Sequence, residues 1–173
     1  MNKDELLDLV NKKDEVIGSV WKSEAHKNPK LIHREIAVAV FNQNGEVLLQ
    51  RRSLNKSKGP GKWQITVAGH VSAGEDPRDA VAREVYEELG FKIKPVYFTK
   101  EFWRSKDGNE ARFFWIYYSL IKSKPVLKPD MAEVMDTKWI KPSEIENFIN
   151  KNNYSIDHKS FKMIIKLSKF LFS

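Results

Sequence analysis

The sequence predicts an α/β (α+β) protein in which a mixed sheet lies between helices, a three-layer α/β/α sandwich. Three observations support this: several strand-like stretches separated by turn residues, a capped helix over Pro77–Leu89, and two helical stretches near the end. The 173 residues are enough for one domain, 1–173, with a buried core. Residues 1–14 are expected to form a loosely ordered extension, and 157–173 an amphipathic C-terminal helix with lysines on its outer face.

The first strands are expected at Glu15–Trp21, Glu35–Phe41 and Glu46–Arg51, with Asn44-Gly45 closing a hairpin between the last two. A basic loop, Leu54–Lys62, follows. The further strands expected are Trp63–Ala68, Val96–Arg104, Ala111–Ile121 and Thr137–Ile140. Lys106-Asp107-Gly108-Asn109 is expected to be a turn, and Pro142 to begin a helix that ends near Asn150.

The central helix is the best defined element. Asp76 suits the N-cap, Pro77 the first helical position, and Gly90 the position after the C-terminus. Val81, Val85 and Leu89 form its apolar side. The sequence therefore predicts a helix whose bounds are set by its own capping residues.

Three carboxylates, Glu84, Glu87 and Glu88, share one face of this helix within a single turn. They would repel one another unless a cation lay between them, and ligation by oxygen alone favours Mg²⁺ or Mn²⁺ over zinc. Arg83 precedes Glu87 by four residues and is placed to orient its carboxylate. This pattern predicts a divalent-metal site on the helix.

Residues 69–91, GHVSAGEDPRDAVAREVYEELGF, resemble the Nudix box: Gly, five residues, Glu, seven residues, then Arg-Glu-aliphatic-x-Glu-Glu-x-Gly-hydrophobic. Every fixed position is filled, by Gly69, Glu75, Arg83, Glu84, Val85, Glu87, Glu88, Gly90 and Phe91. A solvated acidic helix face is the alternative interpretation. The resemblance implies a Nudix-type α/β/α sandwich and hydrolysis of the diphosphate linkage in nucleoside diphosphate derivatives.

The resemblance also implies residue roles. Glu84, Glu87 and Glu88, with the Gly69 carbonyl, would bind the metal, Arg83 would hold a glutamate in place, and Glu75 would brace the loop. The general base would be Glu87 or, on a late loop, Glu133. Because Arg51 and Arg52 are adjacent in a strand, they point to opposite faces, and one of them is expected to grip a phosphate. Trp63 is expected in the core rather than against a base.

Beyond the box, roughly residues 13–150 resemble the Nudix branch related to isopentenyl diphosphate isomerase. His26, His33, His70 and Glu110 match metal ligands of those isomerases, and whether the histidines bind a second metal stays open. Two positions depart from the isomerase pattern: Ala68 stands where its cysteine is expected, and Arg112 where a second ligand carboxylate is expected. A protein without cysteine lacks the expected acid for isomerisation.

The composition indicates only a broad class of binding partner. Thirty Lys and Arg against 23 Asp and Glu give a net charge of +7, which suits polyanionic ligands. A small nucleotide or diphosphate substrate is expected, with an RNA 5′ end as a minor alternative. The sequence shows no membrane span or signal peptide, so a cytoplasmic protein is expected. A non-catalytic nucleotide sensor is a further alternative, and a homodimer is expected only by analogy.

Overall fold

The computed structural model describes residues 4–105 and 108–173. The chain divides into two compact units. Unit 1 is made of the residues up to Ala37, Ala68–Val81 and Tyr97–Tyr117, and unit 2 of Val38–Val67, Ala82–Val96 and Tyr118–Ser173. The expectation of a single domain over 1–173 stays a prediction.

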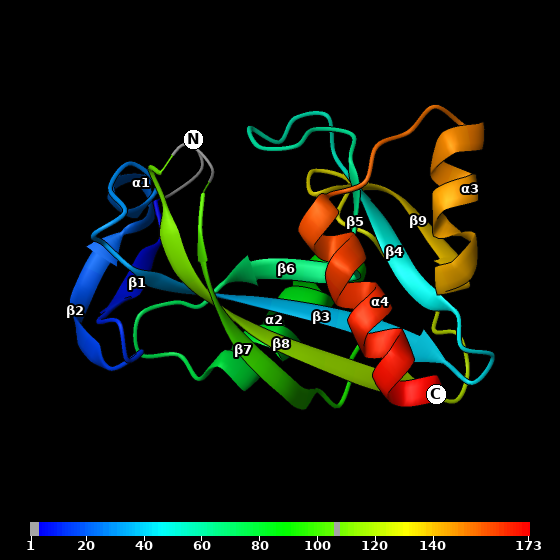
Figure 1. The fold of residues 1–173 in the computed structure, drawn as a ribbon, viewed down its shortest axis with the longest axis horizontal. Helices are drawn as coiled ribbons and strands as arrows, with labels where there is room; N and C mark the ends of the chain where they lie inside the picture. Colours follow the sequence, from blue (N-terminus) through cyan, green and yellow to red (C-terminus); the bar gives the residue numbers. More distant parts are fainter. Residues whose placement is uncertain (1–3, 106–107) are drawn as a thin grey trace. The chain divides into compact units, whose positions relative to one another are not determined.

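Seven strands of the described chain form one sheet with the order β5-β4-β3-β8-β7, in which β6 pairs with β3 and β9 pairs with β4. Their bounds are β3 His33–Asn42, β4 Val47–Arg52, β5 Trp63–Gln64, β6 Val67–His70, β7 Val96–Arg104, β8 Ala111–Ile121 and β9 Val134–Ile140. Helix α2 spans Pro77–Leu89 and α4 spans His158–Phe172. Within unit 2, the Ala82–Leu89 part of α2 and α4 lie on opposite faces of the strands (Figure 1). The expected sandwich with a mixed sheet is confirmed.

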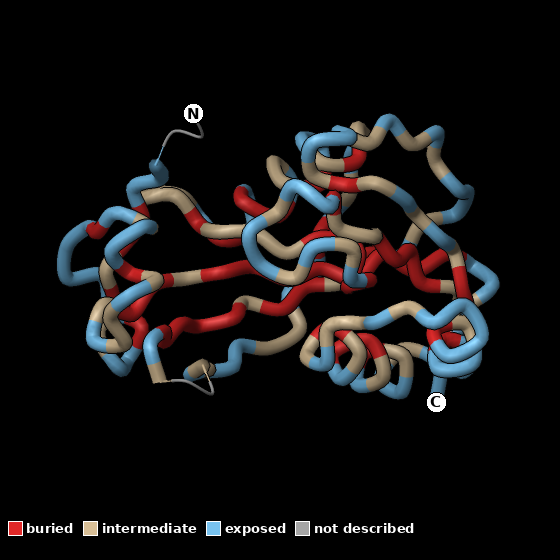
Figure 2. Tube along the Cα trace, turned by 90° about the horizontal axis from the view of Figure 1, so that it is seen from above, coloured by how far each residue is buried: buried red, intermediate tan, exposed pale blue. Residues whose placement is uncertain are grey.

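Strand β4 is central to unit 2. It pairs antiparallel with β5 and with β9, whose register runs from Val47 opposite Ile140 to Arg52 opposite Val134. Val47, Leu48 and Leu49 are fully buried. Strand β4 is buried from Val47 to Gln50, as is typical of a strand covered on both faces. Figure 2 shows buried runs of chain in the interior, with exposed segments mainly at the outside.

Helix α2 begins and ends where the capping residues predicted. Ala80 N donates to Asp76 O, and Gly90 N donates to Tyr86 O at the other end. Gly90 has a φ of +74°, the left-handed conformation that ends many helices. Both late helices expected from the sequence are present. The first consists of a 3₁₀ turn over Pro142–Glu144 followed by α3 (Ile145–Lys151). The second is α4, at whose start the Asp157 side chain accepts a hydrogen bond from Ser160 N.

The single strand expected over Trp63–Ala68 is wrong, because the chain changes partner there. Gln64 pairs with Gln50 of β4, whereas β6 pairs with β3. Between the two strands, the buried Thr66 hydroxyl donates to Leu48 O at 2.6 Å and accepts from Val40 N at 2.9 Å. One side chain thus replaces backbone pairing at the change of partner.

Unit 1 begins with a hairpin of β1 (Leu6–Val10) and β2 (Val16–Trp21), followed by the one-turn helix α1 (Lys22–Ala25). Leu7 and Val10 are buried, so the described part of 1–14 is not the loosely ordered extension expected from the sequence. Arg34 holds the hairpin turn, because its Nε donates to Asp14 Oδ1 at 2.7 Å. Lys106 and Asp107, half of the expected turn, lie outside the described residues.

Candidate active site

The carboxylates of Glu84, Glu87 and Glu88 lie on the part of α2 that belongs to unit 2. Val85 and Leu89 are fully buried and anchor this part of the helix. The Glu87 side chain is 57% exposed, whereas that of Glu84 is 14% exposed. The helix therefore presents one accessible carboxylate beside one that is largely enclosed.

Arg83 contacts two of these carboxylates at once. Its Nη1 donates to Glu84 Oε1 at 2.8 Å and to Glu87 Oε2 at 3.1 Å. The contact with Glu87 was expected from the spacing, and the contact with Glu84 was not. A single guanidinium therefore orients both carboxylates and offsets part of their mutual repulsion.

Glu88 is held by a residue that the sequence did not single out. Gln50 Nε2, on the buried strand β4, donates to Glu88 Oε2 at 2.7 Å. Burial raises the pKa of Glu88 to about 8, with the charges of Glu84 and Glu133 adding to it and the Gln50 hydrogen bond opposing it. Burial and the neighbouring carboxylates therefore disfavour the charged form of Glu88 when no cation is bound.

The loop of residues Lys128–Glu133, called the late loop below, is hydrogen-bonded to the end of α2. Lys128 N donates to Leu89 O and Asp130 N to Glu88 O, each at 2.9 Å. The Glu133 side chain is 33% exposed and forms an ion pair with Lys56 of the basic loop. The structure thus brings the second candidate base close enough to affect Glu88, and adds Lys56 to the site.

The two strand arginines bind the basic loop. Arg51 Nε donates to Gly61 O at 3.0 Å, and its guanidinium lies 4.5 Å from the centre of the Tyr154 ring. Arg52 Nε donates to Lys58 O at 2.9 Å. Phosphate binding by either arginine stays a prediction. Trp63 is 1% exposed and packs against Phe148, so it lies in the core as expected.

Gly69 and Glu75, the other predicted box residues, belong to unit 1. Gly69 is half-buried on β6. Glu75 Oε2 accepts from Ser72 N at 3.0 Å, which closes the loop before α2 in the way a bracing residue would. Metal binding by the Gly69 carbonyl stays a prediction.

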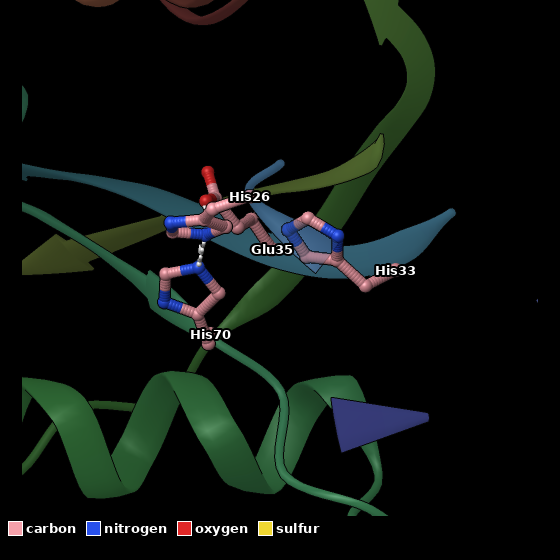
Figure 3. Close-up of side chains that lie close together, drawn as sticks. All are labelled: His26, His33, Glu35 and His70. Carbon is pink, nitrogen blue, oxygen red and sulfur yellow. Dashed lines mark hydrogen bonds and ion pairs between the residues drawn. The ribbon is translucent and has the colours of Figure 1, made fainter. Parts of the chain in front are cut away.

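The three histidines of the isomerase resemblance meet in unit 1 together with Glu35 (Figure 3). One ligand atom from each of His26, His33, Glu35 and His70 lies within 4.8 Å of the others. His26 Nε2 is 2.9 Å from His70 Nε2, and His70 Nε2 is 3.0 Å from Glu35 Oε1. Glu35 was not predicted. Its two-residue spacing from His33 on one strand is the pattern that would have found it.

Arg112 supplies positive charge to this cluster through ion pairs with Glu35 and Glu110. Although burial opposes ionisation of Glu35, the charges of His70 and Arg112 hold its pKa below the usual range. Burial lowers the pKa of His33 to about 4, so this ring is neutral at pH 7, and its buried Nε2 has no hydrogen-bond partner among the described residues.

The two clusters differ in how well they fit a metal ion. The helix carboxylates provide oxygen donors whose negative charge Arg83 offsets only in part, which fits Mg²⁺ or Mn²⁺. The histidine cluster provides imidazole donors that suit a transition metal. However, the Arg112 guanidinium already pairs with both carboxylates there and would repel a divalent cation. As the chain stands, the first site fits a metal and the second does not.

The raised pKa of Glu88 predicts a pH-dependent stability. In the folded protein Glu88 keeps its proton up to about pH 8, whereas the unfolded chain loses it above about pH 4.5. The contribution of Glu88 to the free energy of unfolding therefore falls as the pH rises from about 5 to about 8. Without metal, the loss is expected to reach about 1.4 kcal/mol per pH unit. Urea unfolding of wild type and Glu88→Gln at several pH values measures it. An identical slope in both proteins would contradict the assignment to Glu88.

The chain matches the NUDIX domain family model over residues 31–162. It is 33% identical over 157 residues to an isopentenyl-diphosphate Delta-isomerase of Streptomyces avermitilis, covering 87% of this chain and 78% of that protein. It is also 33% identical over 138 residues to an uncharacterized Nudix hydrolase of Pseudomonas aeruginosa, covering 80% and 79%. Among solved structures, DR0079 from Deinococcus radiodurans superposes with a TM-score of 0.72 at 22% identity, over 98% of this chain and 100% of that one.

The chain therefore belongs to the NUDIX domain family. Its relatives include proteins named as isomerases and proteins named as Nudix hydrolases, in agreement with the branch that the sequence resembles. The likeness to DR0079 bears on the fold alone. None of the helices in the described residues is both long and apolar enough to cross a membrane.

Proposed function

We propose that the chain is a metal-dependent pyrophosphohydrolase that cleaves the diphosphate linkage of nucleoside diphosphate derivatives by attack of water on phosphorus. The observation that carries the proposal is the set of three carboxylates on α2, of which Glu84 and Glu87 are oriented by Arg83, and Glu88 by Gln50. Family membership supports it, because Nudix hydrolases are among the relatives.

Glu84, Glu87 and Glu88 would hold the metal, Mg²⁺ or Mn²⁺. When bound, such an ion neutralises a diphosphate and lowers the pKa of a water. Arg83 keeps two of the carboxylates in position, and Gln50 fixes the third. Glu87 is the more accessible carboxylate and takes the proton from the attacking water, with Glu133 as the second candidate.

Lys56 gives Glu133 a cationic partner on the mobile end of a lysine side chain. When substrate binds, Lys56 would move from Glu133 to a substrate phosphate, which would leave the Glu133 carboxylate available as a base. The basic loop, with Arg51 and Arg52 bound to its backbone, would then supply positive charge for the substrate phosphates. A small nucleotide or diphosphate conjugate in the cytoplasm is the proposed substrate, and an RNA 5′ end requires the same carboxylates.

Isopentenyl diphosphate isomerisation is the second candidate, favoured by the names of the relatives and by the histidine cluster. Two residues weigh against it in this chain. Ala68 provides no acid in place of a cysteine, and Arg112 replaces a carboxylate with a cation. Hydrolysis needs neither group, so it remains the function that the residues support best.

Isotope labelling separates the two reactions. With Mg²⁺ or Mn²⁺ in H₂¹⁸O, a panel of nucleoside triphosphates, CDP-alcohols and other nucleotide conjugates is expected to give products with one ¹⁸O on phosphorus. Isopentenyl diphosphate in D₂O is expected to gain no deuterium. Deuterium incorporation without ¹⁸O transfer would establish the isomerase instead. Nucleotide binding without any product would favour a non-catalytic sensor.

A further inference from the structure

Arg112 of β8 is a buried cation inside the histidine cluster of unit 1. It is 7% exposed, and its guanidinium forms ion pairs with Glu35 and Glu110. The same guanidinium lies 4.7 Å from the centre of the Trp103 ring and 5.9 Å from that of Phe114. Two carboxylates and two aromatic rings therefore hold one positive charge in a fixed place.

Both carboxylates, Glu35 and Glu110, already form ion pairs within the cluster. Glu35 Oε1 is shared between Arg112 and His70 Nε2, which lies 3.0 Å from it. Glu110 pairs with Arg112, and its other oxygen is 4.0 Å from His26 Nδ1. A divalent cation entering the cluster would have to displace the guanidinium from the carboxylates or remain close to it. Both outcomes are unfavourable in a buried site.

We propose that Arg112 is the resident cation of the histidine cluster and stands in place of a metal ion, so that His26, His33, His70 and Glu35 form a structural centre that binds no metal. The centre joins Glu35 on β3, His70 on β6 and Arg112 on β8 through side chains. This role of Arg112 is independent of the reaction at α2, because no residue of the centre belongs to that site.

His33 Nε2 has no hydrogen-bond partner among the residues that the structure describes, so this nitrogen is open to the test of metal binding. With Arg112 in place, the guanidinium pairs with both carboxylates, and the neutral imidazole stays beside it without a metal ion. Replacing Arg112 by glutamate would give the centre three histidines and two carboxylates, namely Glu35 and the new glutamate. Glu110 would be a further carboxylate beside them. The proposal therefore predicts a gain of metal binding from a single substitution.

Wild type provides the first test. Protein freed of metal with EDTA is titrated with Zn²⁺, while the side-chain NMR signals of the histidines are followed. The signals of His26, His33 and His70 are expected to stay unchanged at one equivalent of Zn²⁺. Stoichiometric binding that perturbs these three signals, and that His33→Gln abolishes, would overturn the proposal without reference to any variant of Arg112 or to catalytic activity.

Variants of Arg112 provide the second test. Arg112→Glu is expected to bind one equivalent of Co²⁺ at least about 100-fold more tightly than wild type, with visible absorption that is lost on adding His33→Gln. If Arg112→Glu folds only when Zn²⁺ is present, that dependence itself supports the proposal. Arg112→Lys keeps the charge and is expected to bind no metal. Folded Arg112→Glu without any gain in Co²⁺ affinity would contradict the proposal.

Discussion

Replacing Glu87 by glutamine is expected to reduce turnover of the best substrate by a factor of about 10²–10⁴, the range typical for loss of a general base. The side chain is 57% exposed and touches Arg83 through a charged hydrogen bond, so the amide should leave the helix intact. Steady-state kinetics in saturating Mg²⁺ measure the loss. Retained turnover would remove Glu87 from the mechanism.

The matched control is Glu146→Gln, the same chemical change at an exposed position of α3, which is expected to leave turnover unchanged. Glu133→Gln distinguishes the two candidate bases. If Glu133 is the base, its variant loses turnover while keeping the wild-type affinity for Mn²⁺. If Glu87 acts as a metal ligand as well as the base, Glu87→Gln weakens Mn²⁺ binding too. Electron paramagnetic resonance of Mn²⁺ gives the affinities.

Replacing Gly90 by alanine is expected to lower the free energy of unfolding by about 2–4 kcal/mol. The left-handed φ of +74° accounts for about 1 kcal/mol of this loss. The rest is steric, because an added Cβ would lie 2.7 Å from Lys128 Cβ and 3.0 Å from Lys128 O. The neighbouring backbone has little room to move, since Lys128 N donates to Leu89 O at 2.9 Å.

Gly74→Ala isolates the steric part of this effect. Gly74 has nearly the same φ, +76°, and an added Cβ would have no neighbour within 4 Å. Alanine there is expected to cost only about 1 kcal/mol. Urea unfolding of the two variants, carried out in parallel, measures the difference. Equal losses in the two variants would show that close packing against Lys128 does not contribute.

Local capping explains why α2 was predicted with its observed bounds, whereas β1 and α1 were not predicted. Asp76, Pro77 and Gly90 mark the ends of α2 within the sequence itself. Strand β1 depends on pairing with β2, and α1 is a single turn without a side-chain cap. Elements that depend on partners elsewhere in the chain have little signature of their own.

The residues of the candidate site were also predicted where the signal is local and missed where it depends on distant parts of the chain. The carboxylates of α2 and Arg83 were predicted because their spacing on one helix determines their proximity. Gln50 and Lys56 were missed because they come from β4 and from the basic loop, and no spacing links either residue to α2 or Glu133. Arg112 was noted as a departure from the isomerase pattern, but its pairing with Glu35 required the structure.

The hydrogen bonds between the Lys128–Glu133 loop and α2 limit which parts of that loop can be exchanged in this protein. The backbone amides of Lys128 and Asp130 satisfy the last carbonyl groups of the helix that carries the metal-ligand candidates. A loop grafted from a relative would leave those carbonyls uncapped unless it reproduced both donors. Grafts that begin after Asp130 should therefore be tolerated better than grafts that begin before Lys128.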